Sequence, residues 1–202
     1  MNRSMLVTGL ILIPVLVCGM GCSKKVVSRV DPNTTIDLSG YWNDTDSRLV
    51  AEEMIQDCLS RPWKGRHVDR VGKRPAIIVG RVVNKTTEHI ATATFIGDIE
   101  RALINSGDVE MVAGAAERGQ IRDEREDQQI FSSPETAKQW GKEKGADYMM
   151  TGIISSITDE EEGKKVIYYQ TDLTLIHLED NTKVWLGQKK IKKFIGRKKY
   201  SG

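Results

Sequence analysis

Three long runs of β-prone residues in the last third of the chain constrain its fold more than any other feature. They cover residues 148–157, 166–176 and 183–195, and they are rich in β-branched and aromatic side chains. Short polar turns separate them at residues 160–163 and 179–181. Because strands joined by such short turns pair with their neighbours, the pattern predicts an antiparallel meander.

Helical and strand patterns alternate before this meander. Apolar residues at helical spacing predict helices over residues 47–59 and 93–106, and Gly107 stands where the second helix would end. Short β-branched runs predict strands over residues 75–83 and 109–112. This order is typical of an α+β fold, with a mixed β-sheet and helices packed against the sheet.

Two more segments have helical patterns of different character. Residues 117–129 carry dense charge of both signs and few apolar side chains, which indicates a solvated helix or a mobile segment. A second helix is predicted to start at Ser133 and Pro134, to turn Ala137 and Trp140 inward, and to stop at Gly145.

The first 22 residues have the pattern of a lipoprotein signal peptide. Arg3 supplies a basic start, an apolar run covers residues 5–17, and small residues directly precede Cys22. The run is short, and Gly9 and Pro14 interrupt it, so a membrane-spanning anchor helix is the weaker alternative. We therefore expect a lipid, such as palmitate, on Cys22.

The residues around the cleavage site favour Cys22 over Cys18, because Gly21 is small and Val17 is not. An unlipidated, secreted form stays open as an alternative. The next residue, Ser23, is not the aspartate that keeps enterobacterial lipoproteins in the inner membrane. The predicted destination is the periplasmic face of the outer membrane.

These patterns divide the chain into a signal peptide (1–21), a lipidated flexible tether (22–37) and a single globular domain (38–202). The tether is polar and lacks apolar periodicity. Its length of about 15 residues reaches at most about 50 Å when fully extended.

No constellation of residues predicts catalysis. His67, His89 and His177 lie far apart in sequence, and no Cys-x-x-Cys or His-x-x-x-His pattern suggests a metal site. Gly-x-Ser-x-Gly, Ser-x-x-Lys and phosphate-loop motifs do not occur. Cys58 follows the apolar spacing of the first helix, which predicts a buried core thiol. We therefore expect neither an enzyme nor a cofactor.

Basic residues near the C-terminus form the one strong charge asymmetry. They are Lys189, Lys190, Lys192, Lys193, Arg197, Lys198 and Lys199. Export argues against nucleic acid as the partner. We interpret the run as the charged outer side of an edge strand whose inner side carries Ile191 and Phe194. Binding to anionic lipid or to an acidic partner is the alternative.

Several motifs resemble, in their joint order, those of the penicillin-binding protein activator LpoB family. The similarity covers the chain from Leu38 to Lys193. The motifs are LSGYWNDTD (38–46), GRVVNKT (80–86), ALINSG (102–107), DER (123–125) and GADYMMTG (145–152).

The resemblance implies an outer-membrane lipoprotein with a domain similar to the N-terminal domain of TolB. It implies as partner a class A penicillin-binding protein, the bifunctional synthase of peptidoglycan in cell-wall biogenesis, which determines cell shape. Such an activator needs no catalytic residues, only a surface that favours the active conformation of the synthase.

Candidate contact residues lie at the ends of predicted elements, with a capping or solvated-loop role as the alternative for each. They are Asn84, Lys85 and Thr86 in one loop, and Glu124, Arg125 and Gln128 in the charged segment. The chain departs from the enterobacterial members in its short tether. That departure leaves the identity of the partner open.

Two other functions compete with this interpretation. Curli-secretion lipoproteins resemble the same fold family, so an envelope assembly or pore lipoprotein is the main alternative, and it predicts stable rings. An envelope enzyme acting on cell-wall or lipid substrates is the third hypothesis, and it predicts turnover by the isolated domain.

Overall fold

The computed structural model describes residues 26–133 and 143–196. The chain divides into two compact units, residues 1–32 and residues 33–202. In the first unit, residues 26–32 form neither helix nor strand. Within the described ranges, no helix is both long enough and apolar enough to span a membrane.

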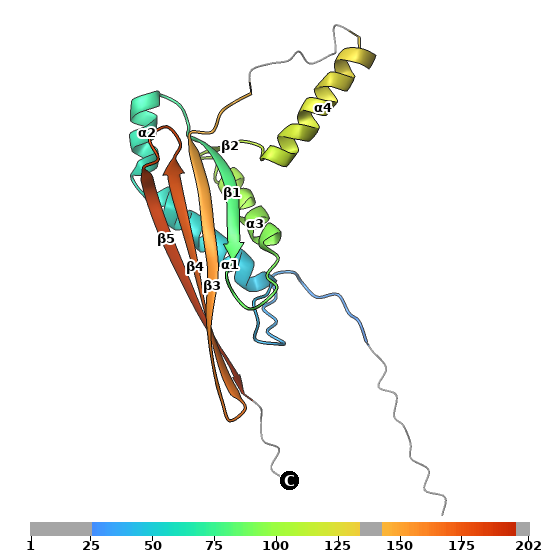
Figure 1. The fold of residues 1–202 in the computed structure, drawn as a ribbon, viewed down its shortest axis with the longest axis vertical. Helices are drawn as coiled ribbons and strands as arrows, with labels where there is room; N and C mark the ends of the chain where they lie inside the picture. The colour runs from blue at the N-terminus through green and yellow to red at the C-terminus, as the bar shows by residue number, and fades with distance from the viewer. Residues whose placement is uncertain (1–25, 134–142, 197–202) are drawn as a thin grey trace, which may run out of the picture. The chain divides into compact units, whose positions relative to one another are not determined.

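A five-stranded sheet organises the second unit (Figure 1). In spatial order the strands are β2 (Glu110–Met111), β1 (Ala76–Asn84), β3 (Tyr148–Glu161), β4 (Lys164–His177) and β5 (Lys183–Gly196). β1 pairs in parallel with β2 and β3, whereas β3, β4 and β5 pair antiparallel. The predicted α+β class, the mixed sheet and the meander are confirmed.

The hairpin between β3 and β4 extends further than predicted. The two strands pair continuously from Tyr148–His177 to Glu161–Lys164, and Glu162 and Gly163 alone form the turn. Both turn residues have positive φ, 49° and 75°, as a two-residue hairpin turn requires. Polar residues therefore continue the ladder past the end of the hydrophobic core.

Four helices lie in the part of the chain that the structure describes: α1 (Asp44–Ser60), α2 (Trp63–Val71), α3 (Thr92–Ser106) and α4 (Ala115–Phe131). α1 packs against α3 and β5, and α3 packs against β1 and β2. Both helices therefore cover the same face of the sheet (Figure 1). Their apolar faces meet the strands in one core, which includes Phe95, Ile99, Leu103, Ile154 and Leu173.

Local capping sets the start of α1. Asn43 accepts a hydrogen bond from the Asp46 backbone N–H, and Asp46 accepts one from the Asn43 backbone N–H, which makes a reciprocal capping box. Val50, Met54 and Cys58 are buried along one face, as their spacing predicts. α3 ends at Gly107 in the left-handed conformation, which is also confirmed.

The sequence patterns did not predict α2. No side chain caps its first turn, and Pro62 occupies the N-cap position. Tertiary contacts hold the helix instead, because Trp63 is buried and donates from Nε1 to the Cys58 carbonyl at 2.7 Å. Gly72 ends the helix at φ 72°.

The prediction that Ile191 and Phe194 share the inner side of β5 is wrong. Ile191 packs against the core, but Phe194 lies on the opposite face and is 67% exposed. Side chains alternate along a strand, so residues three apart point to opposite faces. Lys189 and Lys193, which have the parity of Ile191, face the helices.

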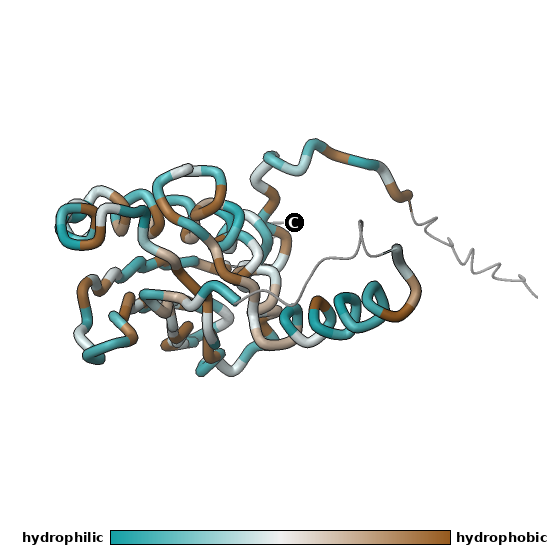
Figure 2. The backbone as a smooth tube through the Cα atoms, turned by 90° about the horizontal axis from the view of Figure 1, so that it is seen from above, coloured by the Kyte–Doolittle hydropathy of each residue, from teal (hydrophilic) through white to brown (hydrophobic). Residues whose placement is uncertain are grey.

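The charged segment forms a full helix, α4, without a buried residue. It is hydrophilic along most of its length and ends in the exposed pair Ile130 and Phe131 (Figure 2). The prediction of a solvated helix is confirmed. Most of the helix predicted from Ser133 to Gly145, with Ala137 and Trp140, lies outside the described residues, as do Cys22, the signal peptide and Arg197 to Lys199.

Candidate interaction surfaces

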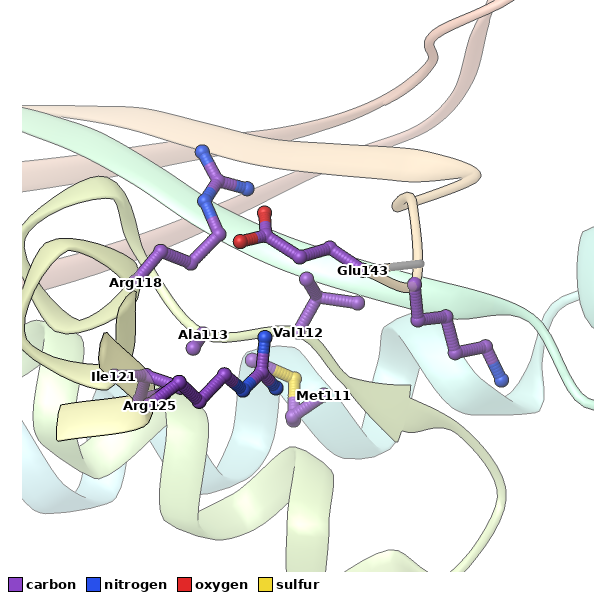
Figure 3. Close-up of a pocket in the computed structure, with 8 residues that line it drawn as sticks. Met111, Val112, Ala113, Arg118, Ile121, Arg125 and Glu143 are labelled. Atoms are coloured by element: carbon purple, nitrogen blue, oxygen red, sulfur yellow. The ribbon is translucent and has the colours of Figure 1, made fainter. Parts of the chain in front are cut away.

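A groove of about 190 Å³ lies where β2 leads into α4 (Figure 3). Its lining mixes apolar and charged residues from three separate segments. They are Met111, Val112, Ala113, Arg118, Ile121, Arg125, Glu143 and Lys144. The apolar part comes from the end of β2 and from Ile121, so one turn of α4 forms a wall of the groove.

The rim of the groove is rich in positive charge. Arg122 donates two hydrogen bonds to the Glu143 carboxylate, at 2.7 and 2.8 Å, and this contact lowers the pKa of Glu143. Arg118 and Arg125 lie close enough to lower that pKa further. Lys144 pairs with Glu110. Cations therefore outnumber carboxylates here, which suits an acidic partner surface.

Two of the three predicted contact residues on α4 interact with each other. Gln128 donates from Nε2 to Glu124 at 2.9 Å, one helical turn away. Arg125 is half-buried and lines the groove, whereas Glu124 is exposed. The structure thus places Arg125 directly beside the apolar floor.

The loop after β1 holds the other predicted residues. Asn84 donates from Nδ2 to the Glu88 carbonyl at 2.7 Å and accepts from the Thr86 N–H at 2.9 Å. The Thr86 hydroxyl donates to Asn84 at 2.7 Å. These side chains shape the loop. Lys85 is exposed at its surface.

The structure does not bring the two groups of predicted residues together. Met111, at the groove, pairs with Ile77 near the start of β1, whereas Asn84 ends that strand. The strand between Ile77 and Asn84 rises about 23 Å. One small contact would not cover both groups.

Two of the four described lysines of the predicted basic strip pair with acidic residues. Lys189 pairs with Glu53 of α1, and Lys193 lies between Asp37 at 2.8 Å and Asp46 at 2.5 Å. Lys190 and Lys192 remain exposed on the other face. Among the described residues of the strip, Lys190 and Lys192 are therefore the ones that can act as a basic surface.

Lys193 also contacts the segment that precedes α1. It binds Asp37 and donates to the Tyr41 carbonyl at 3.0 Å, and Asn43 donates to Asp37 at 2.6 Å. Asp37 thus belongs to the second compact unit, which starts at Asn33. We name these contacts of Asp37, Asp46 and Lys193 the Lys193 clamp.

Among the described residues, Cys58 and two of the histidines are buried. Cys58 is fully buried, and burial raises the pKa of its thiol to about 12, as expected for a core residue. His89 is exposed, but His67 and His177 are buried on either side of Tyr148. In residues 26–133 and 143–196, no three His, Cys, Asp or Glu side chains are grouped to hold a metal ion.

Fold and surfaces together define a small α+β binding domain. Helices cover one face of its sheet, and the other face exposes Ile153, Ile157, Leu186 and Phe194. A groove with a cationic rim lies at the β2 edge.

A family model described as "Peptidoglycan-synthase activator LpoB" matches residues 46–191. This match covers well over half of the chain, so the chain belongs to the LpoB family, a regulatory family of the cell envelope. The resemblance seen in the sequence motifs is confirmed.

Solved structures of family members are similar to this chain at low identity. The C-terminal domain of LpoB from Escherichia coli is 18% identical over 73% of this chain and 98% of that chain, with a TM-score of 0.38. The domain from Salmonella enterica is 16% identical over 72% and 98%, with a TM-score of 0.40. The NMR structure of E. coli LpoB is 14% identical over 96% and 93%, with a TM-score of 0.40. The comparison with curated proteins gave no match.

Proposed function

We propose that this chain is a lipid-anchored, non-enzymatic regulator that binds and activates a class A penicillin-binding protein. The family match supports this proposal, because it runs from the first turn of α1 to the middle of β5 and so spans the whole folded core. Residues 1–21 would be removed, Cys22 would carry the lipid, and the chain would lie on the periplasmic face of the outer membrane.

The proposed contact centres on α4 and the adjoining groove. Activation requires tighter binding to the active conformation of the synthase than to its resting one. α4 suits this task because its side chains are free of core packing, while its first turns border the groove. We propose contacts by Glu124, Arg125 and Gln128, and by Lys85 in a loop shaped by Asn84 and Thr86.

A capture experiment tests the partner. Tagged full-length protein is recovered from membranes, and co-purifying penicillin-binding proteins are identified by mass spectrometry. We expect one class A enzyme to be enriched, and we expect the purified protein to stimulate its glycan polymerisation in a reconstituted assay. Lack of enrichment together with unchanged polymerisation would refute the proposal.

A charge-swapped variant tests the surface. Glu124→Arg with Arg125→Glu keeps the net charge and the helix but reverses the local pattern. We expect stimulation to fall at least tenfold. The matched control is Arg48→Glu with Glu52→Arg, which reverses an exposed pair on α1 and should leave stimulation unchanged. If the synthase is enriched but the charge swap on α4 does not change stimulation, the contact lies elsewhere on the domain.

A further inference from the structure

A cavity of about 390 Å³ opens at the end of the sheet where β4 finishes. Rigid elements form it, namely α2, the first residue of β3, the last residue of β4 and the turn before β5. Tyr148 is its centre, with ring centroids 5.1 Å from Trp63, 5.4 Å from His67 and 5.0 Å from His177. Its volume lies in the range of pockets that bind small molecules or single side chains.

The cavity contains one carboxylate, that of Asp180, which already accepts hydrogen bonds from the protein. Asp180 Oδ1 accepts from the Thr182 N–H and from His177 Nδ1, each at 2.9 Å. With Nδ1 of His177 donating to Asp180, its Nε2 is an acceptor that faces Arg70 Nη2 at 3.5 Å. Asp180 is therefore engaged by His177 and Thr182, and its negative charge still faces the cavity.

Among the described residues, neither of the two arginines that line the cavity has a carboxylate partner. Arg66 and Arg70 lie one turn apart on α2, both line the cavity, and both are exposed. Among the described residues, the closest polar contact of either guanidinium is the weak one to His177. Like charges four residues apart destabilise a helix. An anion between them would remove this repulsion and accept paired hydrogen bonds.

The cavity also contains a buried polar atom without a partner. The His67 side chain is 2% exposed, and its Nδ1 lies 3.1 Å from the Tyr148 hydroxyl. Its Nε2 forms no hydrogen bond with the described residues, and the nearest carboxylate oxygen, of Asp147, is 3.6 Å away. Buried polar atoms are nearly always satisfied in a complete structure, so the wall of this cavity is incomplete without a ligand or water.

We propose that this cavity binds a carboxylate carried by a peptide, with Arg66 and Arg70 as its donors. The planar guanidinium matches a carboxylate, and Tyr148, Trp63 and Val184 supply an apolar wall for the carbon atoms next to it. Inorganic phosphate fits less well, because it lacks an apolar part and its second negative charge would face Asp180. This site goes beyond the proposed function and does not depend on it.

The position of the site in the sheet separates it from the Lys193 clamp. Lys193 of the clamp pairs with Ile167 on β4, and the cavity lies at His177, ten residues further along the same strand, or about 33 Å. A peptide could therefore enter the cavity while the tether holds the opposite end.

Histidine NMR signals test the site in the full-length chain solubilised in detergent micelles. The probe is the blocked peptide Ac-Ala-Glu-Ala-NH₂, and its control is Ac-Ala-Gln-Ala-NH₂, which differs only in the charge of one side chain. We expect the acidic peptide to shift the ring signals of His67 and His177 and to leave those of the exposed His89 unchanged. N-acetyl-L-glutamate, as a free acid, tests whether the peptide context adds affinity.

Paired variants assign the donors. Arg66→Gln with Arg70→Gln should weaken binding of the acidic peptide at least tenfold, whereas Arg48→Gln with Arg101→Gln removes the same charge from α1 and α3 and should leave it unchanged. Equal binding of the two peptides, equal loss in the two double variants, or tighter binding of inorganic phosphate than of the acidic peptide would each overturn the proposal.

Discussion

At the scale of single residues, buried charge in this domain is placed in groups rather than isolated. Lys193 is 10% exposed and contacts two aspartates, of which Asp46 is 11% exposed and Asp37 49%. Burial disfavours the ammonium form, but the hydrogen bonds to Asp37 and Asp46 outweigh it and raise the pKa of Lys193. The same contact lowers the pKa of Asp37.

Replacing Lys193 with methionine should destabilise the fold by about 1–3 kcal/mol. The side-chain volume is kept, but Asp46 loses its cationic partner in a mostly buried position; the exposure of Asp37 keeps the loss below that of a fully buried pair. Urea unfolding measures the change. Lys190→Met, on the exposed face of the same strand, should stay within about 0.5 kcal/mol. Equal effects of the two variants would contradict the clamp.

The buried histidine predicts a pH dependence of stability. Burial lowers the pKa of His67 in the folded chain, so the unfolded chain, with an imidazole pKa near about 6.5, binds the proton more tightly. Stability should therefore fall as the pH drops from 7.5 through 6.5 to 5.5. His67→Gln should flatten the dependence of the urea midpoint on pH over this range, and His89→Gln should preserve it. An unchanged slope in His67→Gln would refute this assignment.

At the scale of elements, the docking of β5 on α1 depends on one tryptophan and one glycine. Trp185 donates from Nε1 to Asp57 of α1 at 2.8 Å. Gly187 follows two residues later on the same face, and a Cβ there would lie 2.1 Å from the Trp185 ring. The tryptophan therefore covers the glycine and reaches the helix.

Gly187→Ala should displace the Trp185 ring and cost roughly 1–3 kcal/mol, from overpacking and the loss of a partly buried hydrogen bond. Thermal unfolding and tryptophan fluorescence measure the change. Gly97→Ala, in α3 with no atom within 4 Å of its Cβ, should instead stabilise the protein by about 0.5–1 kcal/mol. A neutral Gly187→Ala would show that the ring has another stable position.

The sequence patterns predicted those helices and strands whose formation is determined by residues within the same segment. α1, α3 and the meander have apolar periodicity, caps or turn residues that act within one segment. α2 was not predicted although Gly72 caps its C-terminus, because no side chain caps its start and its two buried residues, Trp63 and His67, are stabilised by tertiary contacts. The groove and the cavity are each lined by segments far apart in sequence. In the cavity, His177 lies near His67 because His177 pairs with Tyr148 across β3 and β4. The residues that line these two sites could therefore not be predicted from any single segment of the sequence.

At the scale of the whole molecule, the second compact unit starts at Asn33. The segment between Cys22 and Asn33 spans at most about 40 Å when extended. If Cys22 carries the proposed lipid, a regulator held on a segment of this length reaches only partners close to its membrane.

Cys22→Ala should therefore move the protein from the membrane to the soluble fraction and abolish stimulation of the synthase in cells. The purified variant should keep the circular dichroism spectrum and urea midpoint of the parent, because Cys22 lies in the unit before Asn33. Fractionation and a cell-wall synthesis assay measure both outcomes. Full activity of the released variant in cells would make the anchor dispensable.

The Lys193 clamp also determines how mechanical tension on the anchor would enter the fold. A pull that reaches Asp37 divides between β5, through Lys193, and the first turn of α1, through Asn43. β3 and β4 receive load only through β5, to which β4 is paired along its length. The few contacts of the clamp should therefore rupture before the sheet, which would lengthen the tether while the sheet stays intact.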